Sequence, residues 1–263
     1  MLRRKEKRAS SRKAAKADKK PRRWRPLLKA AAVLALLGAF GAGFAWYILQ
    51  SPFLLVETIY VKDAHALAET EIVEVSGISN EDNILLLDTD AIGERICAMP
   101  YVRACTVARM WPDCVLITVT ERVAVATLVN RNIYYEIDAD AVVLRQLEPD
   151  APHPGPLITQ VAGLGSIEPG QELEQPALRR AIEVWHAFSG ISMARDVTVS
   201  EIAALEPNDI RMYCDELSYE LRWGLGNFAR QARRLDILWK EKGGELGCTE
   251  YLELRFDQDL ACK

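Results

Sequence analysis

The stretch AAAVLALLGAFGAGFAWYIL, residues 30–49, decides how this chain is organised, because it contains no charged residue. As an unbroken helix rising about 1.5 Å per residue, it would be roughly 30 Å long, which is the thickness of a bilayer's hydrocarbon core. A cleaved signal peptide has a shorter apolar core and a small-residue cleavage site, whereas this stretch ends in large residues. We therefore predict a retained transmembrane helix over residues 27–50.

The charges on the two sides of this stretch have opposite signs. Residues 1–26 hold 13 Lys or Arg and two acidic residues, a net of +11, and residues 27–263 hold 20 basic and 35 acidic residues, a net of −15. Lys and Arg beside an apolar span stay in the cytoplasm. We therefore expect residues 1–26 to form a disordered basic cytoplasmic tail, and the acidic remainder to lie outside the membrane.

Aromatic and basic residues flank the span where they would anchor it at the membrane interfaces: Trp24 and Lys29 on one side, Trp46 and Tyr47 on the other. The basic tail could also bind nucleic acid through phosphate contacts. Attraction to anionic lipid explains the same charges more simply, so no nucleic-acid partner is predicted.

All six cysteines follow the apolar stretch, at positions 97, 105, 114, 214, 248 and 262. In an oxidising compartment they could form disulfides, with 15 possible connectivities that the sequence leaves open. No CxxC pair is present and the three histidines are scattered. We predict no metal site and no cofactor.

The first part beyond the span has the pattern of a small unit in the order β-α-α-β-β. Its alternating and helical stretches predict the following elements. They are a strand at 53–61, a helix at 69–75 closed by Gly77, a helix from Asp88 or Thr89 to 98, and strands at 101–110 and 115–127.

The second part is predicted to be mostly strands with two helices. The strands are expected at 132–138, 141–147, 197–204, 209–215, 217–223 and 251–256. One helix is expected at 176–189, and the other begins after Asn227 and ends at Gly243-Gly244. The fold class is thus α+β: one transmembrane helix, a β-α-α-β-β unit, and a mostly antiparallel β domain with two helices.

Four phrases in this order carry a resemblance to a known family: Asn83–Asp88 (NILLLD), Pro100–Val107 (PYVRACTV), Arg109–Pro112 (RMWP) and Val119–Ala126 (VTERVAVA). Behind a lone span, they resemble a POTRA domain and, more narrowly, the FtsQ/DivIB family of bacterial cell-division proteins. The chain departs from the family's pattern at Ala124, where Pro is frequent, and at Ala139 and Ala141, near a usual Asp-Gly turn. The resemblance divides the chain into a POTRA domain at 53–127 and a C-terminal β domain at 128–263.

The resemblance implies a non-enzymatic, single-pass scaffold of the division septum in the inner membrane. It implies FtsB and FtsL-like bitopic proteins as partners of the β domain, and other division proteins as partners of the POTRA domain. A partner segment could add to the free edge of the last strand. The residues expected to contact an FtsB-like partner there are Tyr251, Leu252, Arg255, Phe256 and Leu260.

Two other classes of protein are weighed against this one. A membrane-anchored enzyme is favoured only by Gly224–Ala229 (GLGNFA), a GxGxxA turn before a helix, but no doubly wound pattern surrounds it. The carboxylates form no recognisable acid–base pair, so no catalytic residue and no small-molecule substrate are predicted. A POTRA-bearing outer-membrane transporter or other envelope-assembly protein of that kind would need a barrel of many amphipathic strands, for which too few residues follow Thr127.

Overall fold

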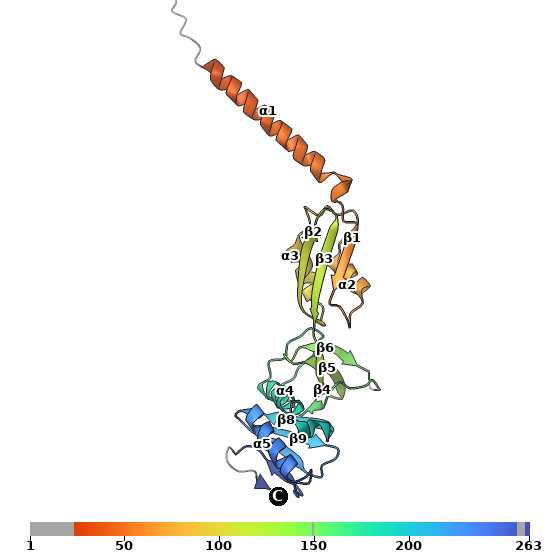
Figure 1. Cartoon of the computed structure of the whole chain (residues 1–263), viewed down its shortest axis with the longest axis vertical. Helices are drawn as coiled ribbons and strands as arrows, with labels where there is room; N and C mark the ends of the chain where they lie inside the picture. The colour runs from red at the N-terminus through yellow and green to blue at the C-terminus, as the bar shows by residue number, and fades with distance from the viewer. Residues whose placement is uncertain (1–23, 149, 257–260) are drawn as a thin grey trace, which may run out of the picture. The chain divides into compact units, whose positions relative to one another are not determined.

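The described part of the protein begins with one long helix (Figure 1). The computed structural model describes residues 24–148, 150–256 and 261–263, with side chains from residue 27 onward. Helix α1 (Trp24–Leu49) contains the segment Leu27–Leu49, which has a mean hydropathy of 2.0 and is long enough to cross a membrane. None of that segment is buried inside the protein. Among the described residues it is the one such helix, and it indicates a single-pass membrane anchor.

The expected anchoring residues are only partly described. The side chains of Lys29, Trp46 and Tyr47 are exposed along α1, as contact with lipid and interface requires. The side chain of Trp24 and residues 1–23 lie outside the described part of the chain. The expected disordered tail therefore stays a prediction.

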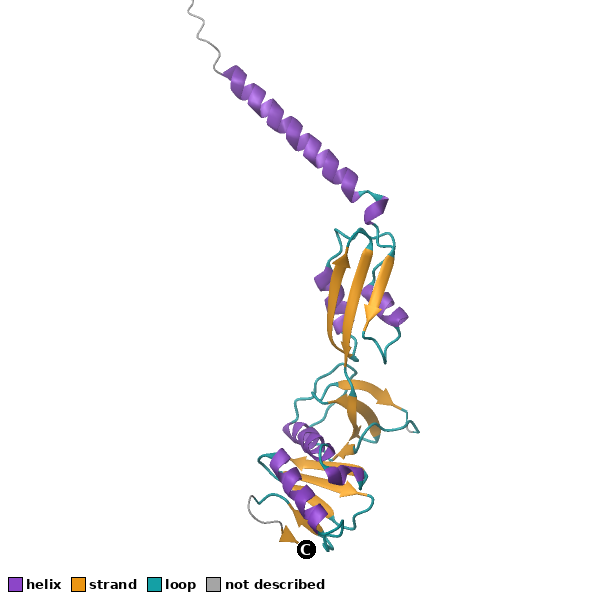
Figure 2. Ribbon diagram, in the orientation of Figure 1, coloured by secondary structure: helices purple, strands orange, loops and turns teal. Residues whose placement is uncertain are grey.

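After α1 and a short 3-10 helix (Pro52–Leu54), the chain forms an α+β unit with a three-stranded sheet (Figure 2). Its elements follow in the order β1 (Thr58–Lys62), α2 (Glu69–Ser76), α3 (Thr89–Cys97), β2 (Val102–Met110) and β3 (Cys114–Glu121). The spatial order is β1-β3-β2, with β1 parallel and β2 antiparallel to the central strand β3. The predicted β-α-α-β-β order is confirmed.

This unit has its own apolar core. The inward-facing residues of β3, Val115, Ile117 and Val119, are at most 1% exposed, and they alternate with more exposed neighbours as a strand with one covered face should. Ile72 of α2 and Ile96 of α3 are fully buried as well. Helix α2 contacts β1, and α3 contacts β2.

Local signals placed the two helices correctly. The Asp88 side chain caps α3 by accepting hydrogen bonds from the backbone N–H groups of Asp90 and Ala91. Gly77 ends α2 with a φ of 67°, a left-handed conformation that favours glycine. The strand expected at 53–61 begins only at Thr58, because the preceding residues bond to a loop instead: Val56 N–H donates to the carbonyl of Asp82.

The strand expected at 115–127 is two strands in two sheets. β3 ends at Glu121, and β4 (Ala124–Asn130) begins after Arg122 and Val123. β3 pairs with β1 and β2, whereas β4 pairs with β5 and β7. The alternation of β3 stops at the charged pair Glu121-Arg122, where the chain changes sheet, and the sequence prediction joined the two strands across it. The domain boundaries proposed from the sequence stay predictions.

The second sheet has nine strands in the described part of the chain, in the spatial order β12-β11-β10-β9-β8-β7-β4-β5-β6. After β4 the strands are β5 (Ile133–Asp138), β6 (Val143–Leu147), β7 (Leu157–Thr159), β8 (Val199–Glu206), β9 (Asp209–Cys214), β10 (Glu220–Trp223), β11 (Tyr251–Glu253) and β12 (Ala261–Cys262). Five of the eight neighbouring pairs are antiparallel, and β4·β7, β7·β8 and β10·β11 are parallel. The prediction of a mostly antiparallel sheet is confirmed.

Helix α4 (Pro176–Ser189) packs on β8 and β9, and α5 (Phe228–Glu241) packs against α4 and a short 3-10 helix at Ser192–Arg195 (Figure 1). Buried residues of α4 and α5 share one core with the sheet. Pro176 starts α4, and Asn227 caps α5 by accepting from the N–H of Arg230. Phe188 of α4 packs edge-on against Trp223 of β10, with ring centroids 6.4 Å apart, and both side chains are fully buried. This core covers one face of β8–β10 and leaves their other face polar.

Candidate partner-binding surface

Strand β11 carries two of the five residues expected to contact a partner, Tyr251 and Leu252, and Arg255 and Phe256 follow it. The exposures of these side chains differ. Leu252 is 1% exposed and belongs to the core, so its side chain is unavailable to a partner. Tyr251 is half-buried, and Phe256, just past the strand, is 57% exposed. The expected strand 251–256 ends at Glu253, because residues 255 and 256 leave the sheet. Leu260 lies outside the described residues.

The edge of β11 is already occupied. β12 pairs with it in antiparallel fashion, Leu252 opposite Cys262 and Glu253 opposite Ala261. A disulfide between Cys248 and Cys262 fastens β12 to the segment before β11. The carbonyl of Lys263 accepts hydrogen bonds from the N–H groups of Thr249 at 2.8 Å and Glu250 at 2.7 Å. The expectation that β11 itself forms the free edge is therefore wrong, and β12 is the outermost strand.

The polar face of β9–β11 is crossed by ion pairs. Arg211 on β9 forms a bidentate pair with Asp209, and Arg222 on β10 pairs with Glu220. The guanidinium of Arg222 also lies 4.0 Å from the ring centroid of Tyr251, a cation–π contact. The hydrogen bonds from Arg211 hold the pKa of Asp209 below its usual range. The face is thus charged but internally paired.

Arg255 fixes the loop that leaves β11. Its guanidinium donates to both carboxylate oxygens of Glu253, a residue that is 3% exposed, and these bonds raise the pKa of Arg255. The arginine side chain crosses directly over Gly224. A Cβ at that position would lie 2.3 Å from Cγ of Arg255, so only glycine fits. This close approach accounts for the first glycine of the GLGNFA turn without a bound nucleotide.

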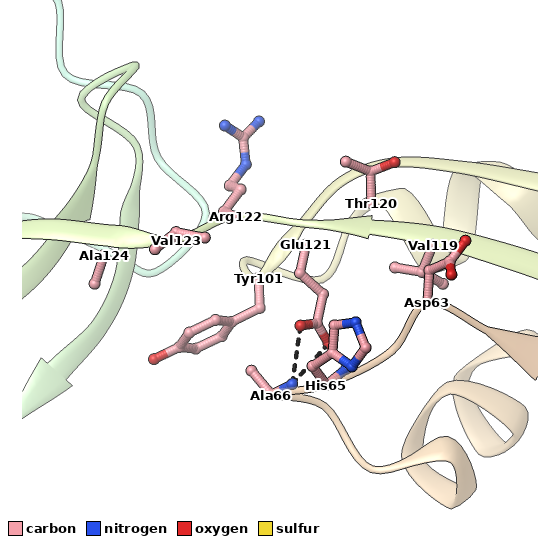
Figure 3. Close-up of a pocket in the computed structure, with 10 residues that line it drawn as sticks. All are labelled: Asp63, His65, Ala66, Tyr101, Val119, Thr120, Glu121, Arg122, Val123 and Ala124. Carbon is pink, nitrogen blue, oxygen red and sulfur yellow. Dashed lines mark hydrogen bonds between the residues drawn. The ribbon is translucent and has the colours of Figure 1, made fainter.

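A second candidate site is an open pocket of about 620 Å³ where β3 ends, shown in Figure 3. Its lining residues are Asp63, His65, Ala66, Tyr101 and the run Val119–Ala124. Glu121 points into it and accepts hydrogen bonds from the backbone N–H groups of residues 65–67 at 2.8–3.0 Å (Figure 3). Burial opposes its ionisation, but these three donors outweigh burial and lower the pKa of Glu121. The carboxylate is engaged in holding the loop.

Side chains near this pocket also join the two sheets. The Tyr101 hydroxyl donates to Glu136 on β5 at 2.5 Å, and burial, followed by this bond, raises the pKa of Tyr101 to about 12. Arg122 pairs with Asp138 at 2.7 Å, with side-chain exposures of 18% and 5%. Sequence analysis missed these pairs, because their partners are 16 and 35 residues apart and no local pattern links them.

No group of three or more His, Cys, Asp or Glu among residues 24–148, 150–256 and 261–263 could hold a metal ion. The fold and surfaces define a class: a helix-anchored protein whose POTRA-like unit is followed by a helix-backed β-sheet with a short, disulfide-fastened outer strand.

Comparisons with known proteins identify the relatives of this chain. Residues 54–122 match the family model described as "POTRA domain, FtsQ-type". The chain is 26% identical over 252 residues to the cell division protein FtsQ of Geotalea daltonii, covering 93% of this chain and 90% of the relative. It is also 26% identical to FtsQ of Syntrophotalea carbinolica, with the same coverage, and 32% identical over 97 residues to the cell division protein DivIB of Clostridium tetani, covering 37% of each. The chain is therefore a relative of the FtsQ/DivIB cell-division proteins, and the resemblance seen in the sequence is confirmed.

Proposed function

We propose that this protein is a non-enzymatic, single-pass scaffold that recruits and links proteins of the bacterial division septum. The observation that carries the proposal is the similarity to proteins named cell division protein FtsQ along 93% of the chain. The apolar helix α1 and the strongly basic residues before it support an inner-membrane address, with the N-terminus in the cytoplasm and the two sheets outside.

We further propose that an FtsB-like partner, with an FtsL-like protein, binds around β11 and β12, and that other division proteins bind the POTRA domain. Two features of the described residues support the first contact. Phe256, which follows β11, exposes its aromatic side chain, and β12, the outermost strand of the sheet in the described part of the chain, is only two residues long. An arriving strand would extend the sheet past β12 or replace β12 on β11.

The proposal predicts that Phe256→Asp weakens binding of the FtsB-like partner. An aromatic anchor at the centre of an interface contributes about 2 kcal/mol or more, so the variant should bind roughly 30-fold more weakly. Two assays test the proposal. Partner affinity is measured as binding of the extracytoplasmic segment of FtsB to the full-length protein in detergent. Septal recruitment is measured as localisation of a fluorescent fusion to midcell.

The matched control is Leu86→Asp, which charges another exposed apolar residue, 68% exposed, in the first α+β unit. It should bind FtsB like the parent protein. If Phe256→Asp is folded and binds FtsB as tightly as the parent, the assigned contact is wrong. A parent fusion spread evenly around the envelope of dividing cells would contradict the septal role itself.

A further inference from the structure

Two cysteines meet inside the first α+β unit. Cys97 is the last residue of α3, and Cys105 lies within β2, the strand that α3 contacts. Their sulfur atoms are 3.1 Å apart. A disulfide bond is about 2.05 Å long, so the two sulfurs need to approach by only about 1 Å to bond.

The surroundings of Cys105 favour this partner. Its thiol lies 3.1 Å from the carbonyl oxygen of Gly93, so helix α3 supplies both of its polar neighbours, one turn apart. The other thiols are engaged or enclosed elsewhere. Cys114 donates to the carboxylate of Asp113, Cys214 is buried, and Cys248 is bonded to Cys262. Of the fifteen pairings that the sequence allows, the structure singles out one for the first unit.

We propose that Cys97 and Cys105 are an oxidisable dithiol, converted to a second disulfide by exchange with a disulfide-bearing oxidant of the extracytoplasmic space. The modification would fasten the C-terminal end of α3 to β2. It stands apart from the proposed partner contact, which involves residues of the other sheet.

Thiol–disulfide exchange balances this reaction in two steps. The thiolate of the exposed Cys97 attacks the oxidant's disulfide, forms a mixed disulfide and releases one thiolate. The thiolate of Cys105 then attacks the sulfur of Cys97 and releases the second thiolate. Two protons leave the protein thiols, and the two electrons reduce the oxidant to two thiols.

The order of the steps follows from exposure. Cys97 is exposed and Cys105 is half-buried. Burial, followed by the hydrogen bond with Cys97, raises the pKa of Cys105 to about 12, which disfavours its attack on an external disulfide. Once Cys97 is in a mixed disulfide, its thiol no longer contributes to that shift. Cys105 then needs to reach only a sulfur that it already touches.

Metal binding is the other use of two adjacent thiols, and the described residues do not support it. Structural zinc sites have four Cys or His ligands, and within the described ranges no third His, Cys, Asp or Glu joins this pair. The neighbouring acceptor is a backbone carbonyl, which suits a thiol and not a soft metal ion.

The test uses the reduced full-length protein in detergent, exposed to oxidised glutathione, then denatured, alkylated and digested with trypsin. Cleavage after Arg95, Arg103 and Arg109 separates Cys97 and Cys105 into peptides 96–103 and 104–109. Mass spectrometry should find these two peptides joined and two hydrogens lighter than their sum. Alkylation of both cysteines should be lost together and return with dithiothreitol.

Internal and variant controls make the result decisive. Cys114, in peptide 110–122, and Cys214 should remain alkylated, and Cys114→Ser should leave the joined peptides unchanged. Cys105→Ser should leave peptide 96–103 alkylated or bound to glutathione. Two outcomes would overturn the proposal. One is full alkylation of Cys97 and Cys105 under conditions that join the peptides of Cys248 and Cys262, and the other is a bond from Cys97 to Cys114 or Cys214.

Discussion

The double substitution Cys248→Ser/Cys262→Ser should release β12 from the sheet. The disulfide joins residues 14 positions apart, so it closes a loop of 15 residues. A disulfide that closes a loop of that length removes conformational entropy from the released state. It thereby stabilises the paired state of β12 by about 3 kcal/mol, which changes the ratio of paired to released β12 by roughly 100-fold. Without the disulfide, only the backbone hydrogen bonds hold β12 in place. Each contributes about 0.5–1.5 kcal/mol, and together they must offset the conformational entropy lost when the segment is ordered.

Amide hydrogen exchange of the full-length protein measures this release. The N–H groups of Thr249, Glu250 and Tyr251 donate to the carbonyl of Lys263, so their exchange should accelerate in the variant by up to about the same factor. Amides of β9, which is separated from β11 by β10, should keep their exchange rates. Cys114→Ser, which removes a thiol outside any disulfide, is the matched control and should leave all of these rates unchanged.

Unchanged exchange at residues 249–251 in the double variant would refute the reasoning, because β12 would then hold its place without the disulfide. The same variant separates the two modes of partner binding. A partner that replaces β12 on β11 should bind more tightly when β12 is released. A partner that extends the sheet beyond β12 should bind more weakly.

Two further substitutions test local features. Glu121→Gln removes the charge that three N–H groups of residues 65–67 share, and should lower the free energy of unfolding by about 1–2 kcal/mol in urea at neutral pH. Because the pKa of Glu121 is lower in the folded protein, its contribution to stability is present at neutral pH and is lost as the pH falls through that folded pKa. If the parent and the variant differ in free energy of unfolding by as much in acid as at neutral pH, the assignment is wrong. Gly224→Ala should cost about 1–3 kcal/mol in thermal unfolding, because its Cβ would overlap Arg255. Gly165→Ala, with no atom within 4 Å of the added Cβ, should leave the stability nearly unchanged. If the two substitutions lower the stability equally, overlap with Arg255 does not explain the effect at Gly224.

Much of the fold could be predicted because its signals are local. Asp88 and Asn227 identify the starts of α3 and α5, and Pro176 and Gly77 mark the start of α4 and the end of α2, since caps and turns depend on residues a few positions apart. The helix α1 could be predicted simply by counting the consecutive uncharged residues. The family resemblance added the order of strands and helices.

The candidate site was less accessible to sequence reasoning. β12 has two residues, too few for any alternation to be seen, and its pairing depends on a disulfide that fifteen connectivities left open. The apolar alternation of β3 ends at Glu121, and Val123 is exposed, but two charged residues in a strand-like run do not by themselves show that the next strand joins another sheet. Leu252 shows the same limit, because only the folded sheet reveals that its side chain faces the core.

The parallel pairing of β1 with β3 has a mechanical consequence. After α1 and the 3-10 helix, the chain enters this sheet at the start of β1, and it leaves the sheet at the end of β3 toward the second sheet. A pull on the residues before β1 and after β3 therefore slides the two strands along each other. It loads their five register pairs, Thr58–Lys62 against Cys114–Thr118, at the same time. Hydrogen bonds loaded together rupture at a higher force than bonds peeled apart in turn. The parallel pairing thus makes the first sheet resist a pull on its two ends in shear.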